Sequence, residues 1–110
     1  MTKFALFFSY TPETWGKLIE NPGDRTAAVR ALTESVGGEL TGLYYMLGDD
    51  DGFVLFDAPD VRAAGALSLA VNSTGAFSSL RTCRLIEAGE LVDVLGTAGA
   101  ARAEYVRPGS

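Results

Sequence analysis

The chain has 110 residues, 47% of them apolar and 21% charged, which is enough to fill the core of one domain. Its formal charge of -5 repels phosphate backbones, so nucleic acid is not an expected partner. The apolar run Phe4–Phe8 is too short for a signal peptide or a membrane span, and the single cysteine, Cys83, agrees with a reducing compartment, so we expect a soluble cytoplasmic protein without a membrane partner.

The first predicted strand covers Lys3–Tyr10, whose near-continuous apolar character suits a central strand of a sheet. A helix is expected directly after it. Thr11 is a good N-cap, Pro12 stands where its missing N–H costs nothing, and Glu13 meets the positive end of the helix dipole. Pro22–Gly23 then breaks this helix.

A second helical segment is predicted to begin at Asp24, which can act as its cap, and to stop at Gly37–Gly38. The next strand is Leu40–Leu47. Gly48–Gly52 is typical of a hairpin turn, so Phe53–Phe56 is expected to return as the third strand.

Ala58–Asp60 opens the next predicted helix, which runs to about Ser73, and Phe77–Ile86 is the fourth strand. Two helical crossovers and a tight hairpin in the middle give the order βα(α)ββαβ. This order predicts an α+β, ferredoxin-like βαββαβ fold, with a four-stranded antiparallel sheet and helices on one face.

The domain is expected to span residues 1–88, with residues 89–110 forming a C-terminal helix and tail, either flexible or at a dimer interface. That helix should be weak because Gly89 and Gly96 interrupt it. From Gly99 onward we expect fraying or a contact with a partner.

The first strand is apolar in both of its alternating registers. Phe4, Leu6 and Phe8 alternate with Ala5 and Phe7, so either face of the sheet would expose large side chains if it were bare. Burying the open face against a second copy resolves this problem. We therefore expect a homodimer or a higher homo-oligomer.

Three segments, Phe7–Trp15, Asn21–Arg25 and Gly48–Gly52, together resemble the GYD domain family of small bacterial proteins. The resemblance covers roughly residues 3–90 and implies a ferredoxin-like fold assembled as a dimeric α+β barrel. The chain departs from the family motif at Asp50, which stands where the pattern has tyrosine. Any role of that tyrosine is therefore lost here.

The chain has no histidine, which removes Ser-His-Asp and Cys-His nucleophile systems, imidazole metal sites and a proximal haem ligand. No glycine-rich phosphate motif follows a strand, so no cofactor is expected. Gly48–Gly52 holds three successive aspartates, but neighbours in a tight turn diverge and the calcium-loop spacing is missing. We interpret this segment as a plain turn with no metal.

The candidate site lies at one end of the first two strands. Tyr10, Trp15 and Tyr44 are expected to converge there beneath the first helix, where aromatic walls suit a flat, largely apolar molecule. Tyr10 is the candidate proton donor or acceptor, because a nearby helix N-terminus should make its phenol more acidic. Ordinary core and interface packing of these rings is the alternative.

Two further residues are candidate substrate contacts. Arg81 lies on the fourth strand and would meet an anionic ligand or a carboxylate if it pointed into a cavity, or solvent if it did not. Asn72 could donate to a ligand carbonyl or help to cap the end of its helix.

Two classes of function therefore remain. The protein is either a small-molecule-binding protein or cofactor-free enzyme acting on an apolar or aromatic compound in a helix-to-sheet cavity, or a non-catalytic oligomerisation or regulatory domain. A cavity filled by its own side chains would favour the second class.

Overall fold

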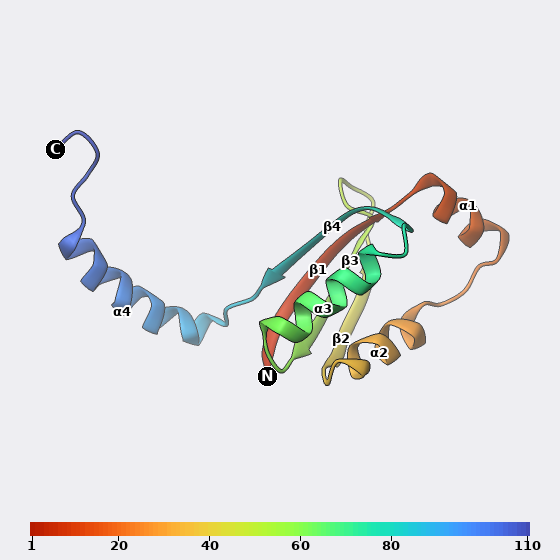
Figure 1. Cartoon of the computed structure of the whole chain (residues 1–110), viewed down its shortest axis with the longest axis horizontal. Coiled ribbons are helices and arrows are strands. Elements are labelled where there is room, and N and C mark those ends of the chain that lie inside the picture. Colours follow the sequence, from red (N-terminus) through yellow and green to blue (C-terminus); the bar gives the residue numbers. More distant parts are fainter.

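The computed structural model describes residues 1–110, and Figure 1 shows the arrangement of the chain. The elements in chain order are β1 (Thr2–Tyr10), α1 (Pro12–Glu20), α2 (Thr26–Ser35), β2 (Glu39–Tyr45), β3 (Gly52–Ala58), α3 (Val61–Asn72), β4 (Phe77–Arg84) and α4 (Ala88–Glu104). The strands form one antiparallel sheet in the order β2-β3-β1-β4. The predicted α+β, ferredoxin-like fold is confirmed.

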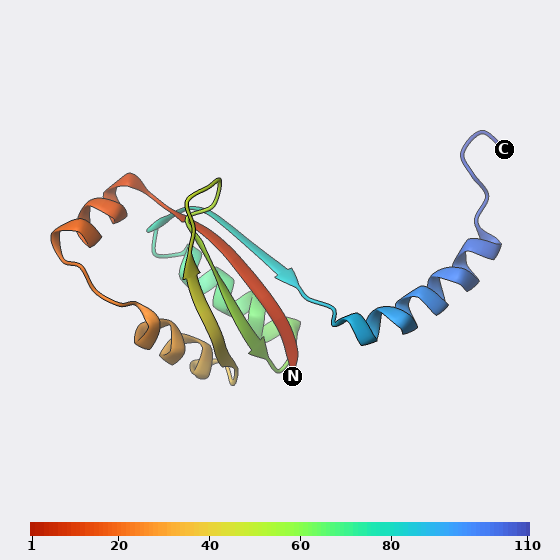
Figure 2. The same cartoon turned by 180° about the vertical axis from the view of Figure 1, so that it is seen from behind.

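Helices cover only one face of the sheet. The core lies between this face and α2 and α3, where Phe4, Phe56 and Leu67 are almost fully buried. On β3 the side chains alternate, with Val54 and Phe56 buried toward the helices and Phe53 half-buried on the opposite face. Seen from behind, the strands lie in front and α3 lies behind them (Figure 2). We call the uncovered side the open face.

A β-bulge on β2 changes which side chains face the helices. Leu40 is paired with Phe56 on the helix side, but the register shifts between Leu40 and Gly42. Beyond the shift Tyr45 is opposite the buried Gly52, on the helix side, whereas Tyr44 points to the open face. Gly42 makes room there, because a Cβ at this residue would come within 2.6 Å of the Tyr44 ring.

A second bulge lies at the other edge of the sheet. Ser9 is paired with Ser79, but Tyr10 is paired with Phe77, so Ser78 is the extra residue. The Ser78 hydroxyl donates toward the Ser9 and Tyr10 carbonyls at 3.3 and 3.4 Å. As a result Phe77 lies on the helix side of the sheet, next to Tyr10.

The predicted cap of α1, Thr11, is confirmed, and α3 is capped by Asp60, which lies in the segment expected to open it. The Thr11 side chain accepts a hydrogen bond from the Thr14 N–H at 3.1 Å, and Asp60 accepts one from the Ala63 N–H at 2.9 Å. For α2 the N-cap is Arg25, one residue later than expected. Asp24 still serves the helix start, since its carboxylate accepts from the Thr26 N–H at 2.8 Å.

The C-terminal helix differs from its prediction. α4 continues through both Gly96 and Gly99 to Glu104, because the many alanines of this segment favour helix enough to offset the glycines. Residues 99–104 are helical, and the expected fraying or partner contact of this segment stays a prediction. α4 projects from the body with no buried residue, and Glu90 forms an ion pair with Arg84 at 3.7 Å (Figure 1). No helix has the length and apolarity needed to cross a membrane.

Replacing Thr11 by alanine should destabilise the protein by about 1 kcal/mol, because it removes the acceptor for the first turn of α1. The melting temperature should fall by about 4–8 °C. The matched control is Thr97→Ala, whose hydroxyl only donates back to the Asp93 carbonyl within α4. Equal melting temperatures for Thr11→Ala and Thr97→Ala would contradict the capping role.

Candidate functional site

A cavity of about 520 Å³ lies between the helices and the covered face of the sheet. Its lining has 19 residues, 14 of them apolar. The sheet provides its floor through residues such as Leu6, Leu43 and Val54. α2 and α3 provide its walls, and short side chains such as Ala28 and Ala70 leave the space between them unfilled.

Aromatic rings gather at one end of this cavity. Tyr10 is at their centre, with ring centroids 5.1 Å from Trp15 and 5.0 Å from Phe77. Its hydroxyl is hydrogen-bonded to the Tyr45 hydroxyl at 3.1 Å, and Phe8 packs beneath at 5.2 Å from the Tyr10 ring. We call these five residues the aromatic cluster. Their perpendicular and tilted pairings are those that aromatic quadrupoles favour.

One carboxylate holds the aromatic cluster in place. Asp51 accepts a hydrogen bond from the Trp15 indole N–H at 2.9 Å and another from the Tyr10 backbone N–H at 2.8 Å. Its own N–H donates to the Phe8 carbonyl at 2.9 Å, which ties the β2–β3 turn to β1. The neighbouring Asp50 points elsewhere and pairs with Arg81 at 3.0 Å. The aspartates of the turn therefore diverge, as adjacent residues in a tight turn should.

Burial raises the pKa of the Tyr10 hydroxyl above its ordinary value, and the hydrogen bond with Tyr45 adds to this effect. The Arg25 guanidinium works in the opposite direction without reversing it. The expected increase in Tyr10 acidity is therefore wrong.

Of the five predicted site residues, only Tyr10 lines the cavity. Trp15 contacts the outer side of the Tyr10 ring and, with Tyr45, borders a separate pocket of about 240 Å³. Tyr44 was expected to converge with Tyr10 and Trp15, and this is wrong. It stacks on Phe53 at 5.3 Å on the open face, because the β2 bulge reverses the alternation before it.

The two predicted polar contacts also lie outside the cavity. Arg81 is on the open face, where its guanidinium covers the Phe7 ring at 4.7 Å and pairs with Asp50. Asn72 is exposed in the last turn of α3, where its backbone carbonyl accepts from the Gly75 N–H at 3.3 Å. Neither lines this cavity, and their assignment as substrate contacts stays a prediction.

Sequence reasoning missed Tyr45, Phe77, Arg25 and Lys17. The first two reach the helix side through bulges, and a glycine inside a strand, such as Gly42, is the one sequence signal that could have indicated a bulge. Arg25 and Lys17 line the cavity from either side of the loop between α1 and α2. No local sequence signal places these two side chains at the cavity.

These features define a single α+β domain with an apolar cavity closed at one end by aromatic rings. The sequence profile of the GYD domain matches residues 4–95, and the chain belongs to this family. Comparison with curated proteins gives no match.

Asp51→Ala should lower the free energy of unfolding by about 1–3 kcal/mol, since it leaves the Trp15 and Tyr10 N–H groups without their acceptor. Trp15 is the only tryptophan, so its fluorescence emission should shift in the same variant. Asp49→Ala is the matched control, because Asp49 is exposed on the same turn. Equal unfolding free energies and emission wavelengths for Asp51→Ala and Asp49→Ala would contradict the anchoring role of Asp51.

Proposed function

We propose that the protein binds a small, largely apolar or aromatic molecule in the cavity between its helices and its sheet. The observation that carries this proposal is the cavity itself, which the protein's own side chains leave unfilled at about 520 Å³. Ligand pockets typically measure about 300–1,000 Å³ and are lined mainly by apolar and aromatic side chains with a few polar groups. The aromatic cluster and the Tyr10 hydroxyl supply that combination.

In this proposal Tyr10 acts as a hydrogen-bond donor. The phenol is protonated at neutral pH, as in an ordinary tyrosine, so it can donate a hydrogen bond. The raised pKa makes it a weaker proton donor and leaves no phenolate to act as a general base. If the bound molecule is also turned over, the reaction is cofactor-free and Tyr10 is its proton donor. A cytoplasmic location belongs to the same proposal, supported by a single free cysteine.

A thermal-shift screen of aromatic and polyketide-like compounds tests this function. A hit present at 100 times its dissociation constant should stabilise the protein by about 2.7 kcal/mol. Tyr10→Phe should weaken binding of that hit by about 0.5–1.5 kcal/mol and, if it is a substrate, lower turnover by about 10²–10⁴-fold.

The matched control is Tyr105→Phe, since Tyr105 is 66% exposed at the end of α4. Unchanged binding and turnover in Tyr10→Phe would remove Tyr10 from the site. A screen without any hit would contradict the binding function and favour the second candidate, a non-catalytic oligomerisation or regulatory domain.

We also propose that the open face pairs two copies of the chain as a homodimer. The supporting observation is an apolar centre on that face, where Phe7 and Phe53 lie 5.7 Å apart and Tyr44 is 54% exposed. Charged pairs surround it, including Lys3–Asp57 at 3.2 Å and the Arg81–Asp50 pair. An apolar centre with a polar rim is the usual composition of a protein interface.

Sedimentation should show a dimer at micromolar concentration, since a stable interface buries about 800 Å² on each partner. Phe53→Lys should convert it to a monomer by placing an unpaired charge at the centre of the interface. Val61→Lys, which changes a residue that is 67% exposed at the start of α3, should leave the dimer intact. A wild-type monomer under these conditions would contradict the dimer.

A further inference from the structure

We propose that the cavity selects an anionic ligand, namely an apolar or aromatic carboxylic acid whose carboxylate is bound by Arg25 at the cavity mouth. This inference rests on the proposed binding function and names the chemical class of its ligand. Three observations carry it: the sign of the charges in the lining, the unpaired state of Arg25, and the hydrogen-bond donors left unused.

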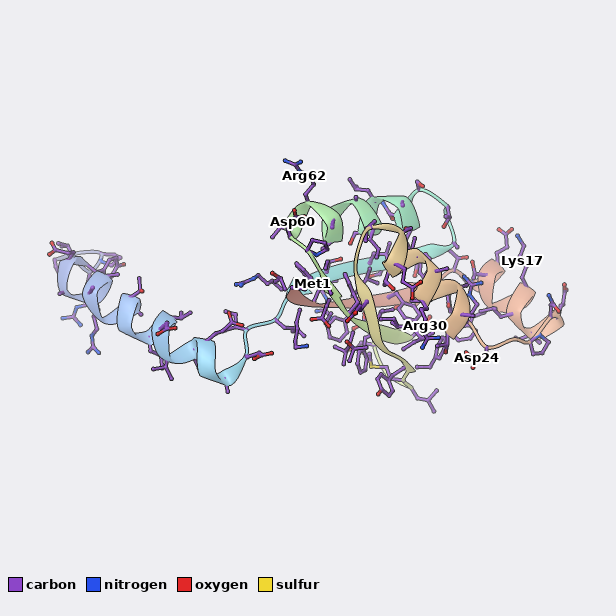
Figure 3. All side chains as sticks on the ribbon, turned by 90° about the horizontal axis from the view of Figure 1, so that it is seen from below. Met1, Lys17, Asp24, Arg30, Asp60 and Arg62 are labelled. Carbon is purple, nitrogen blue, oxygen red and sulfur yellow. The ribbon has the colours of Figure 1, made fainter.

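The charged residues in the cavity lining are both basic. They are Lys17 and Arg25, and no carboxylate lines the cavity. Lys17 stands at the rim, where it is 75% exposed, pairs with Glu13 at 3.4 Å and projects from α1 (Figure 3). Arg25 is exposed as well, but it is the lining cation without an ion-pair partner, on a chain whose net charge is -5.

Arg25 forms none of the protein's four ion pairs. Its neighbour Asp24 forms no ion pair with it: that carboxylate accepts from the Thr26 N–H at 2.8 Å and the Thr26 hydroxyl at 2.6 Å, and the cation that lowers its pKa is Arg30. Arg25 does lie close to the Tyr10 hydroxyl, whose pKa it affects. A guanidinium beside an apolar cavity, without a carboxylate partner, is suited to bind a planar carboxylate through two parallel hydrogen bonds.

The threonine hydroxyls of the lining have already used their protons. Thr14 donates to the Ala76 carbonyl at 2.8 Å, Thr33 to the Arg30 carbonyl at 2.9 Å, and Thr74 to the Val71 carbonyl at 2.8 Å. The donors not engaged by a carbonyl or a carboxylate are then Arg25, which lies near the Tyr10 hydroxyl, and the Tyr10–Tyr45 hydroxyl pair, which shares one hydrogen bond and has a second proton to offer. This inventory matches a ligand that brings acceptors.

The two ends of such a ligand fit the two parts of the site. Its apolar body would occupy the floor formed by Leu6, Leu43 and Val54, and its carboxylate would lie between Arg25 and the Tyr10 hydroxyl. One guanidinium balances one carboxylate charge, so a monoanion is favoured over a phosphate ester with nearly two charges.

The test compares each acid with its carboxamide, which has nearly the same shape and no charge. The probes are benzoate and benzamide, 2-naphthoate and 2-naphthamide, and decanoate and decanamide, measured by titration calorimetry with the full chain. At least one acid should bind about 10-fold more tightly than its amide, as expected for hydrogen bonds to a charged group. Arg25→Gln should weaken the binding of that acid by about 10- to 100-fold and leave the affinity for the amide unchanged.

The matched control is Arg30→Gln, which removes the same charge from the same helix but outside the cavity lining and should change neither affinity. Arg25→Lys should retain part of the preference for the acid, because it keeps the charge and loses the planar fork. Without ligand, the Arg25→Gln protein should have the same melting temperature as the wild type, because Arg25 forms no ion pair that the substitution would remove.

The outcomes separate this inference from the function on which it rests. Equal binding of acids and amides by the wild type would overturn the anionic ligand and leave the apolar binding function standing. Loss of acid binding in Arg30→Gln as well would overturn the role of Arg25. If none of the six probes bound, the inference would fail, and the thermal-shift screen would decide the proposed function separately. The comparison of acid with amide in the wild type holds even if Arg25→Gln does not fold.

Discussion

Side-chain alternation along the strands is the constraint on which the rest of this structure depends. Every residue of the sheet must point either to the helices or to the open face, and a single extra residue exchanges the two faces for all that follow. The bulges before Gly42 and at Ser78 do this at opposite edges of the sheet. Together they bring Tyr45 and Phe77 to Tyr10 and send Tyr44 to the other side.

The aromatic cluster connects the fold to the proposed function. Asp51 links three elements through Trp15 of α1, Tyr10 of β1 and its own turn, so one end of the cavity is a rigid wall rather than a loose loop. α2 and α3 leave the remaining space with short side chains. A preformed apolar cavity is suited to bind the apolar end of a molecule, while the unpaired guanidinium and the protonated phenol beside it are suited to bind the polar end.

The site was only partly predictable, and the reason is register. Tyr10 and Trp15 were placed together correctly because a strand end and the helix directly after it are close in sequence as well as in space. Tyr44 was misplaced because regular alternation from Leu40 puts it on the helix side, and only the pairing with β3 shows the bulge. The face on which Arg81 lies depends in the same way on the pairing of β4 with β1.

The sequence by itself determined the order of the elements, the cap at Thr11 and the hairpin between β2 and β3, because each depends on residues a few positions apart. Only the tertiary structure decided which rings meet, where Arg25 lies and that a cavity remains. These features arise from strand pairings and helix packing between distant segments, and no local pattern encodes the space left between two packed surfaces.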